Sequence, residues 1–209
     1  MKRLWILATA LFGALAGHTA LSAENASLPA GNAQAGATKS AVCQACHGAN
    51  GNSTNPQWPS LAGLGADYIV EQLQNFKDST RKNAVMFPMA STLNPEDMAD
   101  VAAYFNSQAE TGSDADPTYR QAGEQLFRSG DKDRAIPACM ACHGPAGRGN
   151  EPGKIPELRG QHSEYTSAQL IAYASGTRPP GPGEIMGTVA KRLSPDDIRN
   201  VAAYLQGLR

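Results

Sequence analysis

The sequence predicts an all-α protein built from two tandem helical domains, and three observations support this class. First, the halves of the chain repeat each other: residues 93–97 (Leu-Asn-Pro-Glu-Asp) return 100 positions later as residues 193–197 (Leu-Ser-Pro-Asp-Asp), and residues 101–104 return unchanged as 201–204. Second, both copies begin with residue types that start helices. Third, apolar residues follow at helical spacing. Repetition at this long period indicates a duplicated domain rather than a solenoid.

The first 23 residues have the features of a secretory signal peptide. Lys2 and Arg3 provide a positive start, residues 4–16 are apolar, and residues 21–23 (Leu-Ser-Ala) form a plausible cleavage site. The apolar run is shorter than the roughly 20 residues that a membrane span needs. We therefore predict export and removal of residues 1–23, with an uncleaved anchor as the alternative.

Each half should open with a helix that leads toward its cysteine motif. These helices are predicted to start near Asn32 and near Pro117. Each contains one glycine, Gly36 in the first copy and Gly123 in the second. Either glycine could allow a close crossing with the last helix of its domain, because it lacks a side chain. Simple tolerance of glycine within the helix is the alternative.

Two further helices are predicted in each half. The middle helices are expected over residues 68–76 and 165–173. The last helices start after Asn94 and Ser194, which are N-cap residue types followed by proline and acidic residues. Their buried faces repeat at helical spacing. These faces consist of Met98, Val101, Ala102 and Phe105 in the first copy and of Ile198, Val201, Ala202 and Leu205 in the second.

The predicted domain boundaries follow from the repeat and from a polar stretch between the copies. Domain 1 is assigned to residues 24–110, an exposed linker to 111–117, and domain 2 to 118–209. The copies also differ before their cysteine motifs, where the second has extra residues near 129–137 that we predict to form a loop.

All four cysteines lie in two copies of one motif, Cys-x-x-Cys-His. The copies are Cys43, Cys46 and His47 and, in the second half, Cys139, Cys142 and His143. This spacing is the attachment pattern of c-type haem: the thiols bind the vinyl groups and the histidine ligates the iron. Thioredoxin-like disulfides would need a preceding strand, and none is found. Zinc would leave the adjacent histidines and the distant methionines without a role. We predict two covalently attached haem c groups per chain, each forming much of its domain's core.

The repeat also predicts the second axial ligand of each iron. Met86 and Met186 each lie seven residues before the repeated leucine, Leu93 or Leu193. Methionine ligation raises the reduction potential of a haem. Met89 aligns with a valine and is expected to pack near the haem edge, although it stays open as an alternative to Met86.

The remaining histidine of the mature chain, His162, and the net charge narrow the range of possible functions. His162 has no counterpart in the first copy, so it is expected to be a surface residue rather than a ligand. The net charge is -1, and loss of Lys2 and Arg3 changes it to -3. Such a balance, with no basic stripe, argues against nucleic acid as a partner.

On these residues the chain resembles the class I c-type cytochromes twice over, and more specifically the dihaem cytochrome c4 family. The resemblance covers nearly all of the chain after residue 23. It rests on the two cysteine motifs, the two methionines and the repeated last helices, and also on Gly160-Gln161-His162. It implies two cytochrome c domains that pack across a pseudo-twofold interface with the propionate edges of their haems close together. It also implies a periplasmic protein, with possible peripheral association with the membrane.

The expected function is single-electron transfer in respiration, to a terminal oxidase or another redox protein. Two ligands on each iron leave no site for a substrate, so neither an enzymatic activity nor a small-molecule substrate is expected. The alternative is a dihaem enzyme with one open iron, such as a peroxidase or a thiosulfate-oxidising cytochrome. A third possibility is a permanently bound subunit of a larger dehydrogenase. The segments before the two methionines differ, because residues 77–82 include lysine and arginine whereas residues 179–183 consist of proline and glycine, and on this basis the two haems are expected to have unequal potentials.

Overall fold

A computed structural model of the chain describes residues 30–179 and 184–209, and within these residues it is helical with no β-sheet. The predicted all-α class is confirmed, whereas the predicted signal peptide lies outside the described residues. The first half contains α1 (Ala33–Lys39), α2 (Ala41–His47), α3 (Ala66–Lys77), α4 (Met86–Ser91) and α5 (Pro95–Asn106). The second half contains α6 (Pro117–Ser129), α7 (Met140–His143), α8 (Ser163–Ser175), α9 (Ile185–Ala190) and α10 (Pro195–Gln206). No helix in the described part is long and apolar enough to cross a bilayer.

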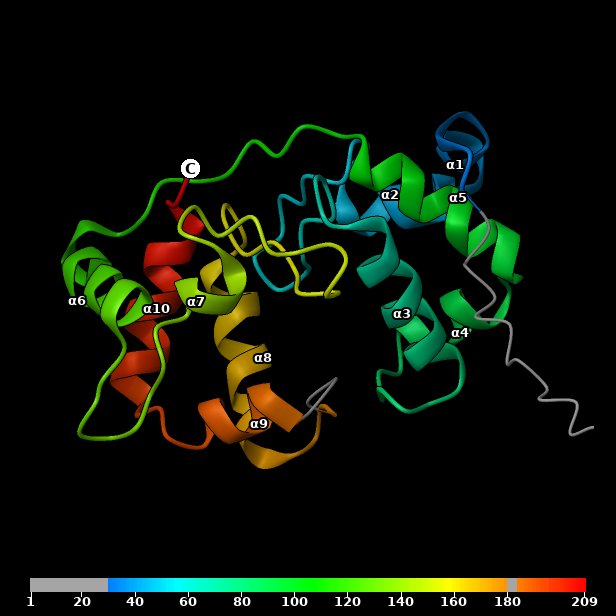
Figure 1. Cartoon of the computed structure of the whole chain (residues 1–209). Helices are drawn as coiled ribbons and strands as arrows, with labels where there is room; N and C mark the ends of the chain where they lie inside the picture. Colours follow the sequence, from blue (N-terminus) through cyan, green and yellow to red (C-terminus); the bar gives the residue numbers. More distant parts are fainter. Residues whose placement is uncertain (1–29, 180–183) are drawn as a thin grey trace, which may run out of the picture.

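The two halves form separate helical bundles of matching architecture (Figure 1). In the first, α1 and α3 pack on α5, and α4 packs on α3; in the second, α6 and α8 pack on α10, and α9 packs on α8. The extended segment between α5 and α6 joins them, and α3 and α8 flank the boundary between the bundles (Figure 1). The duplication predicted from the sequence is therefore present in space.

Local capping explains where the principal helices begin. Asn94 accepts from the backbone of Asp97, and Asp97 accepts in return from the Asn94 backbone, which completes a capping box. Ser194 and Asp197 form the same arrangement in the second half. Asn32 caps α1 by accepting from the backbone of residues 34 and 35. These starts confirm the predicted N-caps.

Each bundle is closed by a tight crossing between its first and last helices at a glycine. A Cβ atom on Gly36 would lie 2.0 Å from the backbone oxygen of Asp100, and one on Gly123 would lie 2.0 Å from that of Asn200. No side chain fits at such a separation. The close-crossing prediction for these two glycines is therefore confirmed.

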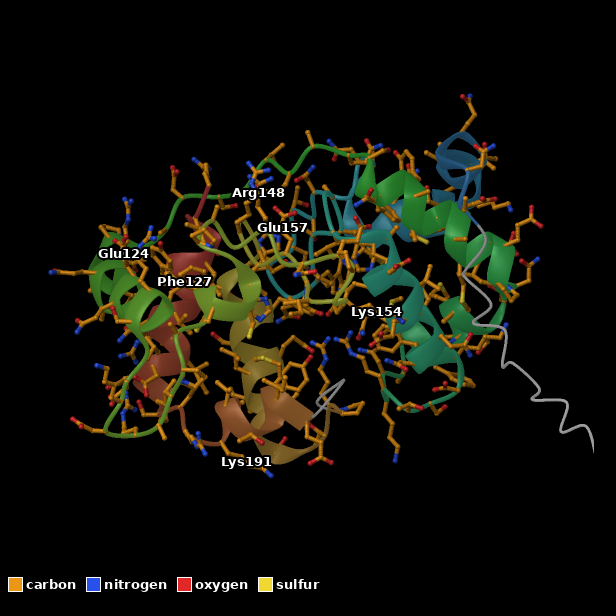
Figure 2. The ribbon with its side chains drawn as sticks, viewed as in Figure 1. Glu124, Phe127, Arg148, Lys154, Glu157 and Lys191 are labelled. Atoms are coloured by element: carbon orange, nitrogen blue, oxygen red, sulfur yellow. The ribbon has the colours of Figure 1, made fainter. Side chains whose placement is uncertain are left out.

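Each bundle has its own apolar core. Phe105 and Met98 are almost fully buried in the first, and Phe127 is fully buried in the second, where its ring contacts that of Tyr204 at a centroid distance of 5.4 Å. Phe127 lies within the second bundle, on α6, whereas Lys191 lies at the surface beyond α9 (Figure 2). Because the aromatic residues are few, each core is small for a domain of this length.

The segments that differ between the copies have defined contacts. Residues 130–139 form the predicted loop, closed by an isolated bridge between Asp131 and Ile136. The segment around the predicted linker is held against both bundles. Thr111 donates its backbone N–H to the Asn52 side chain at 2.9 Å, and Gln206 donates to the Asp114 carbonyl at 2.8 Å. The domain boundaries themselves stay a prediction.

The capping box of α10 predicts an acid-sensitive contribution to stability. Hydrogen bonds from Arg134 and Ser194 outweigh partial burial and lower the pKa of Asp197 to about 2. Since the unfolded carboxyl titrates near pH 4, the stabilisation is present above that pH and is lost as the pH falls through about 2. We expect Asp197→Asn to cost about 1 kcal/mol at neutral pH. In urea titrations, the difference from the parent protein should shrink between about pH 4 and pH 2.

Asp196→Asn is the matched control for this prediction. Asp196 lies in the same helical turn and carries the same charge, but its side chain is 73% exposed and its partner Arg199 is also exposed. Exposed ion pairs contribute little. An Asp196→Asn variant that lost as much stability as Asp197→Asn would contradict the proposed role of the capping box.

Candidate haem sites

Short helices hold the two cysteine motifs. Cys43, Cys46 and His47 occupy the last turns of α2, whereas Cys139 caps α7, which ends at His143. Gly48 and Gly144 follow with φ of 84° and 77°, in the region that favours glycine, so the chain turns away directly after each histidine. Both histidines therefore stand at the end of a helix with their rings directed into the domain.

The two histidine rings are held in the same way. The Nδ1 atom of His47 lies 2.8 Å from the carbonyl oxygen of Pro59, and Nδ1 of His143 lies 2.9 Å from that of Pro156. A carbonyl can only accept, so Nδ1 carries the proton in each ring and Nε2 keeps its lone pair. Burial lowers the pKa of both histidines, against the opposing effect of these hydrogen bonds. Each imidazole is thus neutral and oriented, as a metal ligand requires.

The four cysteines of the two motifs form no disulfide with one another. Burial raises the pKa of Cys139 to about 11 and also raises the pKa of Cys43. No group of three or more His, Cys, Asp or Glu side chains gathers around a common point in residues 30–179 and 184–209.

In the first domain, the cysteine motif and the predicted methionine ligand meet on one apolar surface. Cys43 and Met86 both pack against the same buried cluster, which includes Leu73 and Phe76 of α3. Met89, one turn further along α4, is 38% exposed. Met186 lies in the first turn of α9 and is partly buried. In the second domain Cys139 packs on a comparable cluster, with Leu158 and Leu170 at its edge.

These residues fit a haem in each domain. A haem needs a covalent anchor, a neutral imidazole, a second axial donor and apolar walls. Each copy supplies the thiols, the oriented histidine and an apolar cluster, and each also has a methionine on the short helix before its last helix. The chemistry of the donors therefore agrees with the group that the motif predicts.

One sequence prediction is wrong: His162 is not a surface residue. Its side chain is buried, and its Nε2 atom lies 2.8 Å from the carbonyl oxygen of Ser53 in the other domain. Neighbouring Gln161 donates to the carbonyl oxygen of Ser60 and accepts from its backbone N–H, both at 2.9 Å. The missing repeat partner did not mean exposure, because these residues join the two domains. His162 and Gln161 are interface residues that sequence reasoning missed.

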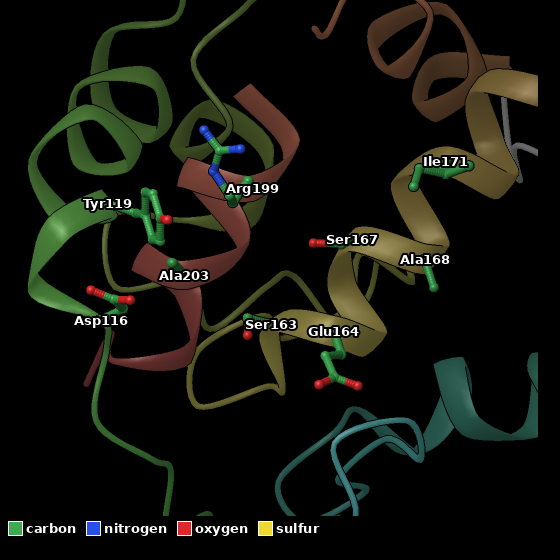
Figure 3. A pocket seen from close by; sticks show the side chains of 9 residues that line it. All are labelled: Asp116, Tyr119, Ser163, Glu164, Ser167, Ala168, Ile171, Arg199 and Ala203. Carbon is green, nitrogen blue, oxygen red and sulfur yellow. The ribbon is translucent and has the colours of Figure 1, made fainter. Parts of the chain in front are cut away.

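A groove on the outer side of the second domain is separate from both motifs. It has a volume of about 480 Å³ and lies among α6, α8 and α10, with Asp116, Glu164 and Arg199 on its walls (Figure 3). Asp116 caps α6, and Arg199 lies 4.9 Å from the centre of the Tyr119 ring. Asp116 and Arg199 thus have structural roles, and no residue that lines the groove belongs to the predicted haem sites.

Two helical domains, each with a Cys-x-x-Cys-His motif, an oriented neutral histidine and a methionine on the short helix before its last helix, define a dihaem c-type cytochrome. The cytochrome c family model matches residues 33–109 and 121–209. Cytochrome c4 of Azotobacter vinelandii is 43% identical over 189 residues, which covers 86% of this chain and 90% of that protein. The crystal structure of reduced recombinant cytochrome c4 from Pseudomonas stutzeri aligns with a TM-score of 0.84 at 44% identity, over 86% of this chain and 100% of that one.

The chain belongs to the cytochrome c family, in its dihaem cytochrome c4 group, and so carries two covalently bound haem c groups and transfers electrons rather than catalysing a reaction. A more distant relative is a thiosulfate dehydrogenase electron acceptor of Stutzerimonas stutzeri. It is 38% identical over 176 residues, covering 82% of this chain and 81% of that protein. Both are named as electron-transfer proteins, which agrees with the predicted absence of enzymatic activity.

Proposed function

We propose that each domain binds its haem through the residues that the repeat identifies. Cys43 and Cys46 anchor the first haem, with His47 and Met86 as axial ligands; Cys139 and Cys142 anchor the second, with His143 and Met186. The observation that carries this assignment is the matched geometry of the two histidines, each of which donates from Nδ1 to a proline carbonyl. This bond leaves Nε2 free toward the apolar interior in both domains.

The choice of Met86 over Met89 rests on burial. Met86 packs on the cluster that also contacts Cys43, whereas the side chain of Met89, three residues further along the same short helix, is 38% exposed. A ligand must face the interior that the histidine faces. Met86 satisfies this condition, and it occupies the same place in the repeat as Met186.

Bound haem supplies the one-electron couple of its iron, and the chain determines how that couple is used. The histidine and the methionine of each domain would together hold the iron and so disfavour binding of other molecules to it. The apolar clusters exclude water, and the hydrogen bonds to Pro59 and Pro156 hold the imidazoles in one orientation in both oxidation states. Little rearrangement then accompanies the gain or loss of an electron, which suits a carrier.

We further propose that the protein works in the periplasm as a respiratory carrier, giving electrons to a terminal oxidase or another redox protein. The signal-like residues 1–23 support export, and the separation into domains 24–110 and 118–209 suits entry of an electron at one haem and exit at the other. Peripheral association with the membrane fits this role and is part of the same proposal.

The test is the absorption spectrum of the purified protein, followed by exposure of the reduced form to carbon monoxide. We expect two haems per chain, a weak long-wavelength band from methionine–iron bonding in the oxidised form, and no carbon monoxide shift. These results follow if every iron has two protein ligands. Prompt carbon monoxide binding at one haem would instead show an open iron and contradict the proposed ligand set.

A further inference from the structure

The hydrogen bond that orients His47 leads to a peptide group that a residue of the other domain also contacts. The carbonyl oxygen of Pro59, which accepts from Nδ1 of His47 at 2.8 Å, belongs to the peptide group between Pro59 and Ser60. The N–H of the same peptide group donates to Oε1 of Gln161 at 2.9 Å. Because Gln161 lies in the second domain, one peptide group connects the histidine of the first domain with a side chain of the second.

The contact between Gln161 and Ser60 has a defined orientation and is shielded from water. The Nε2 atom of Gln161 donates to the carbonyl oxygen of Ser60 at 2.9 Å, beside the bond that its Oε1 atom accepts. A backbone N–H can only donate and a carbonyl can only accept, so the two bonds fix which end of the amide carries the oxygen. Gln161 and Ser60 are each 8% exposed. The Gln161 oxygen is therefore a fixed acceptor for the peptide group that holds His47.

The repeat places a matching peptide group beside the second histidine. Pro156 and Glu157 lie 97 positions after Pro59 and Ser60, and the Pro156 carbonyl oxygen lies 2.9 Å from Nδ1 of His143. The two histidines thus use the same kind of acceptor. A difference between them can then arise from what the N–H at the other end of each peptide group contacts.

The second peptide group lacks the contact that Gln161 makes in the first. Leu64 takes the place of Gln161 in the repeat, and it is a buried apolar residue that cannot accept a hydrogen bond. Within residues 30–179 and 184–209, no acceptor is found for the backbone N–H of Glu157, and its carboxylate bonds to Arg159. In this part of the chain, only the peptide group beside His47 is bonded at both ends.

A peptide group bonded at both ends is a stronger acceptor than one bonded at its oxygen alone. Hydrogen bonds in a chain polarise one another, by about 10–30% per bond, so an acceptor on the N–H makes the carbonyl oxygen more negative. A stronger acceptor at Nδ1 of a metal-ligating histidine makes that ligand more basic. A more basic ligand stabilises ferric iron over ferrous iron, so hydrogen bonding around the ligand changes the reduction potential.

We propose that Gln161 is a positioning residue that acts across the domain boundary on His47 and lowers the reduction potential of the first haem. The inference rests on the proposed function, because it requires His47 to ligate the iron. It extends that function by giving a residue of the second domain an influence on the first haem and not on its own. Gln161 acts through the peptide group between Pro59 and Ser60, since its bonds run to this segment and not to the histidine.

The experiment replaces Gln161 by methionine, a side chain of similar length that has no amide. The holoprotein is titrated with redox mediators and followed by NMR, so that each midpoint is assigned to its own haem. We expect the midpoint of the first haem to rise in Gln161→Met, while the midpoint of the second haem stays unchanged. In the reduced protein the Nδ1–H proton of His47 should shift upfield because its hydrogen bond weakens, whereas that of His143 should not move.

His162→Leu is the matched control. His162 is adjacent to Gln161, is also buried and also bonds across the boundary, but its acceptor is the carbonyl oxygen of Ser53 and not the peptide group beside His47. This variant should leave both midpoints and both Nδ1–H signals in place. Equal changes in Gln161→Met and His162→Leu would show a general effect of a loosened boundary and would overturn the proposal.

An unchanged first midpoint and an unchanged His47 signal in haem-loaded Gln161→Met protein would also overturn it. Haem content and the methionine–iron band are measured on every sample, so that failure of the ligand assignment is recognised separately. Should Gln161→Met not take up haem, the reduced parent protein provides the second test. Its His47 Nδ1–H proton should resonate at lower field than that of His143, and equal positions or the reverse order reject the proposal.

Discussion

Replacing Met186 by alanine is expected to open the iron of the second domain while leaving the first domain closed. Met186 is the only methionine of α9, and alanine cannot reach a metal. Reduced Met186→Ala protein should bind carbon monoxide at one haem per chain, and the oxidised protein should lose about half of the methionine–iron band. The midpoint of that haem should fall by on the order of 0.2 V, within the roughly 0.8 V range that axial ligands set.

The corresponding experiment in the first domain separates Met86 from Met89. We expect Met86→Ala to open the first iron, because Met86 packs on the cluster that contacts Cys43. Met89→Ala should leave the spectrum and the potential unchanged, because the Met89 side chain is 38% exposed. Since both residues lie on α4 and both substitutions remove the same atoms, Met89→Ala is the matched control.

A histidine substitution tests whether ligation itself, rather than packing, is responsible. In Met186→His the new histidine can replace the methionine, which gives the iron two nitrogen ligands. Carbon monoxide binding should then be suppressed, while the potential of that haem stays below its value in the parent protein. Carbon monoxide binding by Met89→Ala and not by Met86→Ala would reverse the assignment in the first domain. Failure of all of these variants to bind carbon monoxide would show that other residues complete the coordination.

Local signals explain why so much of the fold could be predicted from the sequence. The starts of α5 and α10 follow from Asn94 and Ser194, because a cap and the acidic residue three positions later act within a single turn. The haem motif is equally local, since its spacing places both thiols and the histidine on one short helix. Because the domain is duplicated, each local signal occurs twice. The alignment of Met86 with Met186 therefore favours Met86 over Met89 as the iron ligand of the first domain.

The features that the sequence did not predict depend on contacts between segments that are far apart in the chain. The acceptors for His47 and His143 are the backbone carbonyls of Pro59 and Pro156, and a carbonyl has no side-chain signature. His162 was expected at the surface because it lacks a repeat partner, whereas it bonds to Ser53 across the interface. A duplicated domain can pack against its copy through residues that only one copy has, so the repeat is a poor guide at the interface.

The contacts between the two domains are of two kinds: some follow the repeat and others do not. Arg81 and Arg178 follow the repeat with an offset of 97 positions, and each donates to a tyrosine hydroxyl and a glutamine oxygen of the other domain. Gln161 and His162 do not follow the repeat. Their contacts with Ser60 and Ser53 of the first domain therefore have no equivalents made by the first domain to the second. Symmetric contacts would treat the two haems alike, and asymmetric contacts can make their environments differ. The asymmetric contacts therefore add a second reason, besides the different segments before Met86 and Met186, to expect unequal potentials for the two haems.

Gly123→Val is expected to be among the most destabilising substitutions in the second domain. A Cβ on Gly123 would lie 2.0 Å from the backbone oxygen of Asn200 and 2.7 Å from Cβ of Tyr204, so α6 and α10 must separate. Overpacking against a rigid backbone costs about 3 kcal/mol or more. For a domain of this size such a loss lowers the melting temperature by roughly 12 to 24 °C. Calorimetry of the holoprotein measures it directly.

Gly153→Ala is the control for this substitution, because its new Cβ would meet its nearest neighbours at 3.5 Å, an ordinary contact. It should melt within a few degrees of the parent protein. Gly36→Val should instead destabilise the first domain, since the same crossing joins α1 to α5. If Gly123→Val melted like Gly153→Ala, the helices could separate without loss, and the close crossing could not be what holds the last helix beside the haem-binding half of each domain.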